Sequence, residues 1–157
     1  MFQLKTEEML VKTFRPRDRA GMEIPSDLKF PLFVRDYVAW REPSGAGVRL
    51  VFGPPGGGAP TGIFFRRAHG EPNTAQMCEW CHTGGGADQN GLMTADVNSR
   101  KRAGITICLD LRCQEKIEDA ANRAGRSALE AKKALMERIA KFAHEALGID
   151  LSGAGRS

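Results

Sequence analysis

Four cysteines in two close pairs constrain this chain more than any other feature of its sequence. Two residues separate Cys78 from Cys81, and four separate Cys108 from Cys113, with twenty-six residues between the pairs. The sequence holds no other cysteine. Two short-spaced pairs of thiols are typical of a tetrahedral metal site, which Zn²⁺ occupies most often. The spacing therefore predicts one Zn²⁺ bound by all four cysteines.

Disulfide bonds and redox chemistry are the alternative uses of such pairs. Residues 1–10 lack the charged and apolar regions of a secretory signal, and no run of eighteen apolar residues could span a membrane. We therefore expect a cytoplasmic protein, in which thiols stay reduced and metal binding is favoured over disulfides. A thioredoxin-type pair would open a helix after a strand in a βαβ unit, and no such pattern follows Cys78.

Length and charge are those of an ordinary folded domain. The chain has 157 residues, which is near the usual size of one domain, and 27% of them are charged. We predict a single zinc-binding domain over residues 1–150, with a sheet at about 30–70, a zinc lobe at about 75–125 and a disordered tail at 151–157. The net charge of +4 is spread along the chain, so the sequence shows no concentrated basic face of the kind that binds nucleic acid.

Periodicity and turn residues predict the elements before the cysteines. Residues 6–14 are expected to form a short helix with Thr6 as N-cap. Residues 15–31 are turn-rich and should wrap the surface. Runs of β-branched and aromatic residues, separated by glycine and proline, predict an antiparallel meander of three strands at 33–40, 47–52 and 61–67.

The cysteine pairs fall at the ends of predicted elements. Two strands at 92–97 and 104–109 should form a hairpin, and a helical pattern runs from 110 to about 124. A second helix, capped by Ser127, presents an apolar face made of Leu135, Ile139, Phe142, Ala143 and Leu147. A cysteine knuckle, a hairpin and a helix start, in that order, are typical of a treble-clef zinc finger. The predicted class is α+β: an antiparallel β-sheet with a four-cysteine treble clef and C-terminal helices.

The chemistry expected of this site is structural. Four thiolates complete a tetrahedral shell and leave no open position for a substrate. His82 directly follows Cys81 and is the alternative ligand; otherwise it lies at the surface or beside the site. No Ser/His/Asp or paired-carboxylate arrangement with motif spacing is visible, so we predict no catalytic residue and no enzyme.

The cysteines and their neighbours resemble a known family. The matching features are Met77-Cys78-x-Trp80-Cys81, the strand Leu92-Met93-Thr94, and Ile107-Cys108-x-Asp110-Leu111-x-Cys113. The chain resembles the treble-clef zinc domain of the elongation factor G-binding, fusidic-acid-resistance proteins of the FusB type, over roughly residues 30–147. This resemblance implies Zn²⁺ on the four cysteines and a role in binding elongation factor G on or near the ribosome. The resistance proteins carry a helical-bundle domain before the zinc lobe, whereas this chain is expected to have at most one short helix there.

Aromatic and basic side chains near the cysteines are candidates for contacting a partner, either elongation factor G or, alternatively, rRNA or DNA. An exposed Trp80 would be an interface anchor, and basic side chains suit acidic protein or phosphates. Alternatively, Trp80 packs over the zinc site, and the charged turn is simply solvated. The predicted partner-binding residues are Trp80, Phe65, Arg66, Arg67, Arg100, Lys101 and Arg102.

Overall fold

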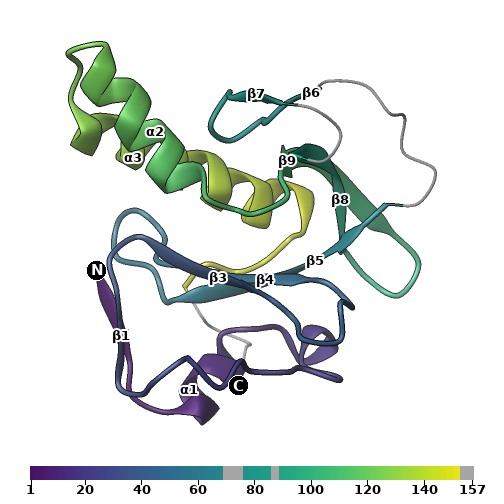
Figure 1. Cartoon of the computed structure of the whole chain (residues 1–157). Helices are drawn as coiled ribbons and strands as arrows, with labels where there is room; N and C mark the ends of the chain where they lie inside the picture. The colour runs from purple at the N-terminus through teal and green to yellow at the C-terminus, as the bar shows by residue number, and fades with distance from the viewer. Residues whose placement is uncertain (69–75, 86–88, 153–157) are drawn as a thin grey trace.

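The chain folds around one five-stranded antiparallel sheet with a layer on each face (Figure 1). A computed structural model describes residues 1–68, 76–85 and 89–152. Helices α2 and α3 lie on one face of the sheet, and the N-terminal segment lies on the other. The sheet has the order β3-β4-β5-β8-β9, with bounds Tyr37–Arg41, Val48–Phe52, Thr61–Arg67, Asn90–Asp96 and Arg102–Cys108.

The predicted meander is present as β3, β4 and β5, but the first predicted strand is divided. Residues Leu32–Val34 form β2, which pairs with β1 (Phe2–Leu4) in a separate small sheet. The break falls at Arg35 and Asp36, where the Asp36 carboxylate lies 3.5 Å from Lys132 of α3. The prediction of one continuous strand at 33–40 is therefore wrong, because its first part pairs with β1 and its second part pairs with β4.

The segment before β2 covers the second face of the sheet. Helix α1 (Glu7–Lys12) begins at Thr6, whose hydroxyl accepts a hydrogen bond from Met9 N, as its capping residue type predicts. The turn-rich segment that follows packs Met22, Ile24, Leu28 and Phe30 against a small second core. This segment therefore forms a layer of the fold, and every residue of β4 is buried between the two layers.

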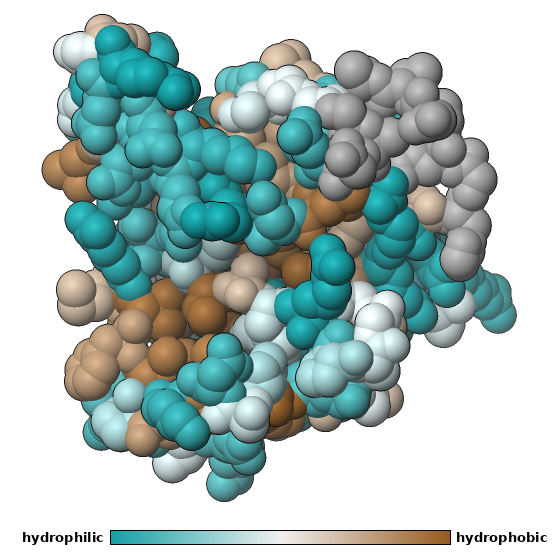
Figure 2. All heavy atoms as spheres, in the orientation of Figure 1, coloured by the Kyte–Doolittle hydropathy of each residue, from teal (hydrophilic) through white to brown (hydrophobic). Residues whose placement is uncertain are grey.

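The C-terminal helices complete the main core. Helix α2 spans Cys113–Arg123 and helix α3 spans Ala128–Lys141, with the Ser127 hydroxyl accepting from Glu130 N. A short π-helical turn, η2 (Phe142–Ala146), continues α3. Figure 2 shows mainly hydrophilic side chains on the outside of this layer and apolar ones where it meets the sheet. The predicted apolar face of α3 is confirmed, because Leu135, Ile139, Ala143 and Leu147 are buried and Phe142 packs against them.

The predicted start of the first C-terminal helix and the predicted start of the tail both differ from the structure. Helix α2 begins at Cys113, not at 110, because Leu111 has a left-handed φ of 53° and the Asp110 carboxylate accepts from Arg112 N to close a turn. Leu151, assigned to the tail, packs against the main core, and its carbonyl accepts from Ala59 N. Residues 153–157 of the predicted tail lie outside the described residues. No helix in the described part of the chain is long and apolar enough to cross a membrane.

Candidate metal centre

The first cysteine pair lies on a tight turn between two very short strands. Strand β6 (Gln76–Met77) pairs with β7 (Gly84–Gly85), and the knuckle between them holds Cys78 and Cys81. The turn closes because His82 N donates to Cys78 O at 2.8 Å and His82 adopts a φ of 62°. Cys81 N lies 3.4 Å from Cys78 Sγ, so a backbone amide faces one sulfur of the pair. These contacts aim both sulfurs to the same side.

A buried asparagine that the sequence analysis did not single out fixes this knuckle. The Asn90 side-chain amide donates to Gln76 O at 2.8 Å and to Thr83 O at 2.7 Å, on the two sides of the turn. Asn90 is 2% exposed and is the first residue of β8. A polar residue at the start of a strand is unremarkable in sequence, so no local pattern could have revealed this role.

The second pair lies where a strand ends and a helix begins. Cys108 is the last residue of β9, and Cys113 is the first residue of α2. The left-handed Leu111 turns the chain between them, with Leu111 N donating to Cys108 O at 3.2 Å. Cys113 thus stands in the first turn of α2, where the helix dipole stabilises a thiolate. This placement confirms the predicted strand-to-helix position.

The four sulfurs fit a single zinc ion. All four lie within 4.8 Å of one another, with 3.7 Å between Cys78 Sγ and Cys113 Sγ and 3.5 Å between Cys81 Sγ and Cys108 Sγ. With a Zn–S bond of about 2.3 Å, a regular tetrahedron places its sulfurs about 3.8 Å apart. A disulfide would bring two sulfurs to about 2.05 Å, and all four cysteines are free. The geometry is that of a metal site.

Proton sharing among the thiols also favours a cation. Hydrogen bonding with Cys108 lowers the pKa of the Cys78 thiol to about 7. The same neighbour, followed by the other two thiols, raises the pKa of Cys113 well above its usual range. Four thiols this close therefore do not all ionise by themselves. A divalent cation supplies the positive charge that allows four thiolates to coexist.

One lysine supports the cluster from helix α2. Lys116 Nζ lies 3.2 Å from Cys108 Sγ and 3.3 Å from Asp110 Oδ1. An ammonium group beside a thiolate offsets part of its charge, and such outer hydrogen bonds orient metal ligands. Cys81 is the half-buried ligand of the four, while the other three are buried. His82, the alternative ligand, is exposed and stands outside the sulfur cluster.

Two of the predicted partner-binding aromatics belong to the core. Trp80 is 2% exposed and Phe65 is 0% exposed, so neither side chain is available at the surface. The Trp80 ring lies edge-on to Phe65 and to Phe142, with ring centres 5.7 Å and 6.2 Å apart. Arg138 Nε of α3 also donates to Trp80 O at 2.7 Å. The prediction that these rings anchor a partner is wrong, because they attach the knuckle to the sheet and to the helical layer.

The predicted basic residues lie in three places. Arg66 and Arg102 both pair with Asp96, at 2.9 Å and 3.2 Å, so one carboxylate offsets part of their charge. Arg100 and Lys101 are exposed at the β8–β9 turn. Arg67 is exposed at the end of β5, where its backbone pairs with that of Met93. The structure thus brings Arg66 and Arg102 together and leaves Arg100 and Lys101 on a turn, while contact with a partner stays a prediction.

Comparison with known proteins identifies the family. A family model described as the FBP C-terminal treble-clef zinc-finger matches residues 7–148. The chain belongs to this family. As a four-cysteine treble clef, it holds one structural Zn²⁺ through Cys78, Cys81, Cys108 and Cys113. No curated protein sequence matches this treble-clef chain.

The fold of this chain is similar to that of another protein whose structure is solved. It is the fusidic acid resistance protein FusC, which matches with a TM-score of 0.52 and 14% sequence identity. The alignment covers 95% of this chain and 60% of FusC. At this identity the likeness concerns the fold. The chain corresponds to only part of the length of FusC.

Proposed function

We propose that this chain is a non-enzymatic module that binds elongation factor G and modulates how the factor interacts with the ribosome. The observation that carries the proposal is membership of the treble-clef family over residues 7–148, supported by a fold like that of a fusidic acid resistance protein. The chain spans 60% of FusC, so the proposal concerns factor binding and not drug resistance itself.

The closed metal site supports a role without catalysis. Four thiolates saturate tetrahedral zinc, and catalytic zinc sites keep an open position for water or substrate. Three of the four cysteines are buried, and Trp80, which lies between two of them in sequence, packs against Phe65 and Phe142. The ion therefore holds a surface in shape, and the function lies in what that surface contacts.

The exposed turn between β8 and β9 is the part of the zinc lobe best suited to meet an acidic partner. Arg100 and Lys101 are exposed there, whereas the charges of Arg66 and Arg102 are partly offset by Asp96. Rim charges of this kind mainly raise the association rate and set the salt dependence of binding. We expect the turn to steer the factor toward the zinc lobe.

Titration calorimetry of the zinc-loaded chain with purified elongation factor G tests the proposal. The expected result is a saturable complex in the micromolar range or tighter, weakened by the double substitution Arg100→Glu and Lys101→Glu. The matched control reverses the charge of two exposed arginines outside the β8–β9 turn, with the substitutions Arg17→Glu and Arg123→Glu. Absence of a complex with the unaltered chain would remove the proposal.

Nucleic-acid binding is the second candidate, favoured by the same exposed basic turn. Binding through phosphates weakens steeply as salt rises, because condensed counterions are released. Fluorescence anisotropy with an rRNA fragment at increasing salt distinguishes the two functions. A steep salt dependence, lost on Arg100→Glu and Lys101→Glu, would favour this candidate; absent or salt-insensitive binding would dismiss it.

A further inference from the structure

Two arginines occupy positions on the sheet face that otherwise forms the main core. Arg41 of β3 is directly opposite Val48 of β4, and Arg67 of β5 is directly opposite Met93 of β8. Since side chains alternate between faces along a strand, Arg67 shares its face with the buried Phe65. Most other sheet positions on this face are filled by apolar residues. Both arginines therefore stand where the core ends and the sheet continues.

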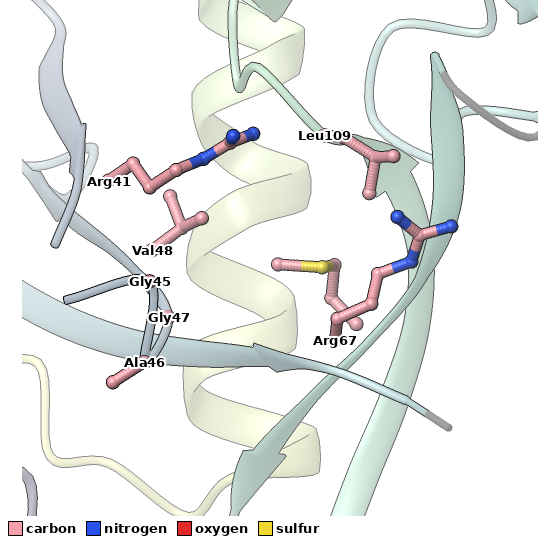
Figure 3. Close-up of a pocket in the computed structure, with 8 residues that line it drawn as sticks. Arg41, Gly45, Ala46, Gly47, Val48, Arg67 and Leu109 are labelled. Atoms are coloured by element: carbon pink, nitrogen blue, oxygen red, sulfur yellow. The ribbon is translucent and has the colours of Figure 1, made fainter. Parts of the chain in front are cut away.

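The space that these arginines flank is a cavity of ≈ 250 Å³ at this end of the sheet. Figure 3 shows Arg41 and Arg67 on opposite sides of the pocket, with both guanidinium groups extending toward Leu109. Val48 and Met93 add apolar side chains to the lining. The pocket thus combines an apolar floor with two cationic walls.

The remaining wall is a turn with little side-chain bulk. Gly45, Ala46 and Gly47 line this side of the pocket. A Cβ at Gly47 would lie 2.4 Å from Phe65 O and 2.5 Å from the Phe64 ring, so a side chain is excluded there. The turn therefore packs closely on β5 and adds little side-chain bulk to the pocket.

Arg41 and Arg67 are the charged side chains among the described residues that line the pocket. No carboxylate is among the described residues that line it. The Arg41 guanidinium is exposed and forms no hydrogen bond or ion pair with any residue that the structure describes. Arg67 has a further interaction within the chain, so Arg41 is the main candidate for binding an anionic group. A guanidinium group that faces a concave apolar site favours an anionic group beside an apolar one.

We propose that this pocket binds an acidic segment of a partner protein, with Arg41, assisted by Arg67, holding a carboxylate and the aliphatic floor holding an adjacent apolar side chain. Nucleic acid fits the pocket less well, because unpaired bases are bound by stacking on aromatic rings and the described residues of the lining include none. The site goes beyond the proposed function, since it is defined by the chemistry of the segment and not by the identity of elongation factor G.

The test uses a short probe peptide, acetyl-Gly-Leu-Asp-Leu-Gly-amide, and its Asn analogue, added to the zinc-loaded chain. Binding is followed by NMR through the Arg Nε–H signals and the methyl groups of Val48, Met93 and Leu109. The Asp peptide should shift the Arg41 signal and these methyl signals saturably. The Asn peptide should bind about tenfold more weakly, which corresponds to about 1.4 kcal/mol, because it cannot form the charge-assisted hydrogen bond.

Substitution of the arginine completes the experiment. Arg41→Gln should weaken binding of the Asp peptide to the affinity of the Asn peptide. Arg123→Gln, which removes an exposed arginine of α2 outside the pocket, should leave the affinity for the Asp peptide unchanged. Equal binding of both peptides, no shifts at millimolar peptide, or shifts produced by single-stranded RNA in place of the peptide would each overturn the proposal. None of these outcomes depends on whether elongation factor G binds, so the two proposals fail separately.

Discussion

The indole ring of Trp80 lies edge-on to the ring of Phe65, with ring centres 5.7 Å apart. Trp80 stands between two zinc ligands on the knuckle, and Phe65 is a core residue of β5. This contact joins the metal site to a strand of the central sheet. Zinc binding and packing of the main core are therefore coupled, and this pair of rings is one of the contacts that couple them.

Truncation of this ring should destabilise the whole domain. Trp80→Ala is expected to lower the free energy of unfolding by about 3–5 kcal/mol, because it opens a large cavity in the core. Trp80→Phe should cost less, since the buried indole Nε1 has no hydrogen-bond partner among the described residues and its removal costs no hydrogen bond. Denaturant titration of the zinc-loaded variants measures both values.

Leu129→Ala is the control for that series, because Leu129 is 76% exposed on α3. It should change the free energy of unfolding by no more than about 0.5 kcal/mol. A Trp80→Ala variant as stable as this control would show that the knuckle and the sheet fold independently.

Removal of the lysine beside the cluster should weaken zinc binding. Lys116→Met loses the ammonium group that lies 3.2 Å from Cys108 Sγ. Loss of an outer hydrogen bond to a metal ligand typically lowers affinity about 10–100-fold. Competition with a chromophoric chelator measures the affinity, and the rate of alkylation by iodoacetamide reports thiolate reactivity, which should rise. Lys133→Met, at an exposed position of α3, should leave both unchanged; a Lys116→Met variant that matches it would contradict a role for Lys116.

A buried carboxylate should give the fold a specific pH dependence. Burial raises the pKa of Asp18 above its ordinary value of 3.8, although the Arg15 guanidinium opposes this shift. The folded chain then binds this proton more tightly than the unfolded chain does. The stability that Asp18 contributes is thus fully present below pH 3.8 and lost as the pH rises through the raised pKa.

Asp18→Asn isolates this effect, because the variant lacks the titrating group and keeps every other one, including the thiols. The free energy of unfolding of the unaltered chain minus that of Asp18→Asn should fall as the pH rises from 3.8 toward neutrality. Denaturant titrations at several pH values give this difference. A difference that increases with pH would mean that pairing with Arg15 outweighs burial.

Local patterns in the sequence were sufficient to predict the metal ligands and the residues that cap two helices. The spacing of four cysteines and the order of strand, turn and helix predict the zinc site without knowledge of the rest of the chain. Thr6 and Ser127 are likewise predictable, because a capping hydroxyl bonds to a backbone amide three residues away. These features depend on residues that are close in sequence.

Contacts between distant segments could not be predicted in the same way. The pairing of Arg66 and Arg67 with Thr94 and Met93 joins the meander to the zinc hairpin in one sheet, and no local pattern encodes it. The burial of Trp80 follows from that arrangement. So does the position of Arg41 on the core face, because strand register decides which side of the sheet a residue occupies.

X-ray absorption at the zinc edge tests the central claim, a metal site closed by four sulfurs, most directly. The purified chain should contain one equivalent of zinc with four sulfur neighbours at about 2.3 Å and no lighter ligand. A first shell that contains nitrogen or oxygen, or a folded chain without metal, would contradict a closed structural site and reopen the question of catalysis.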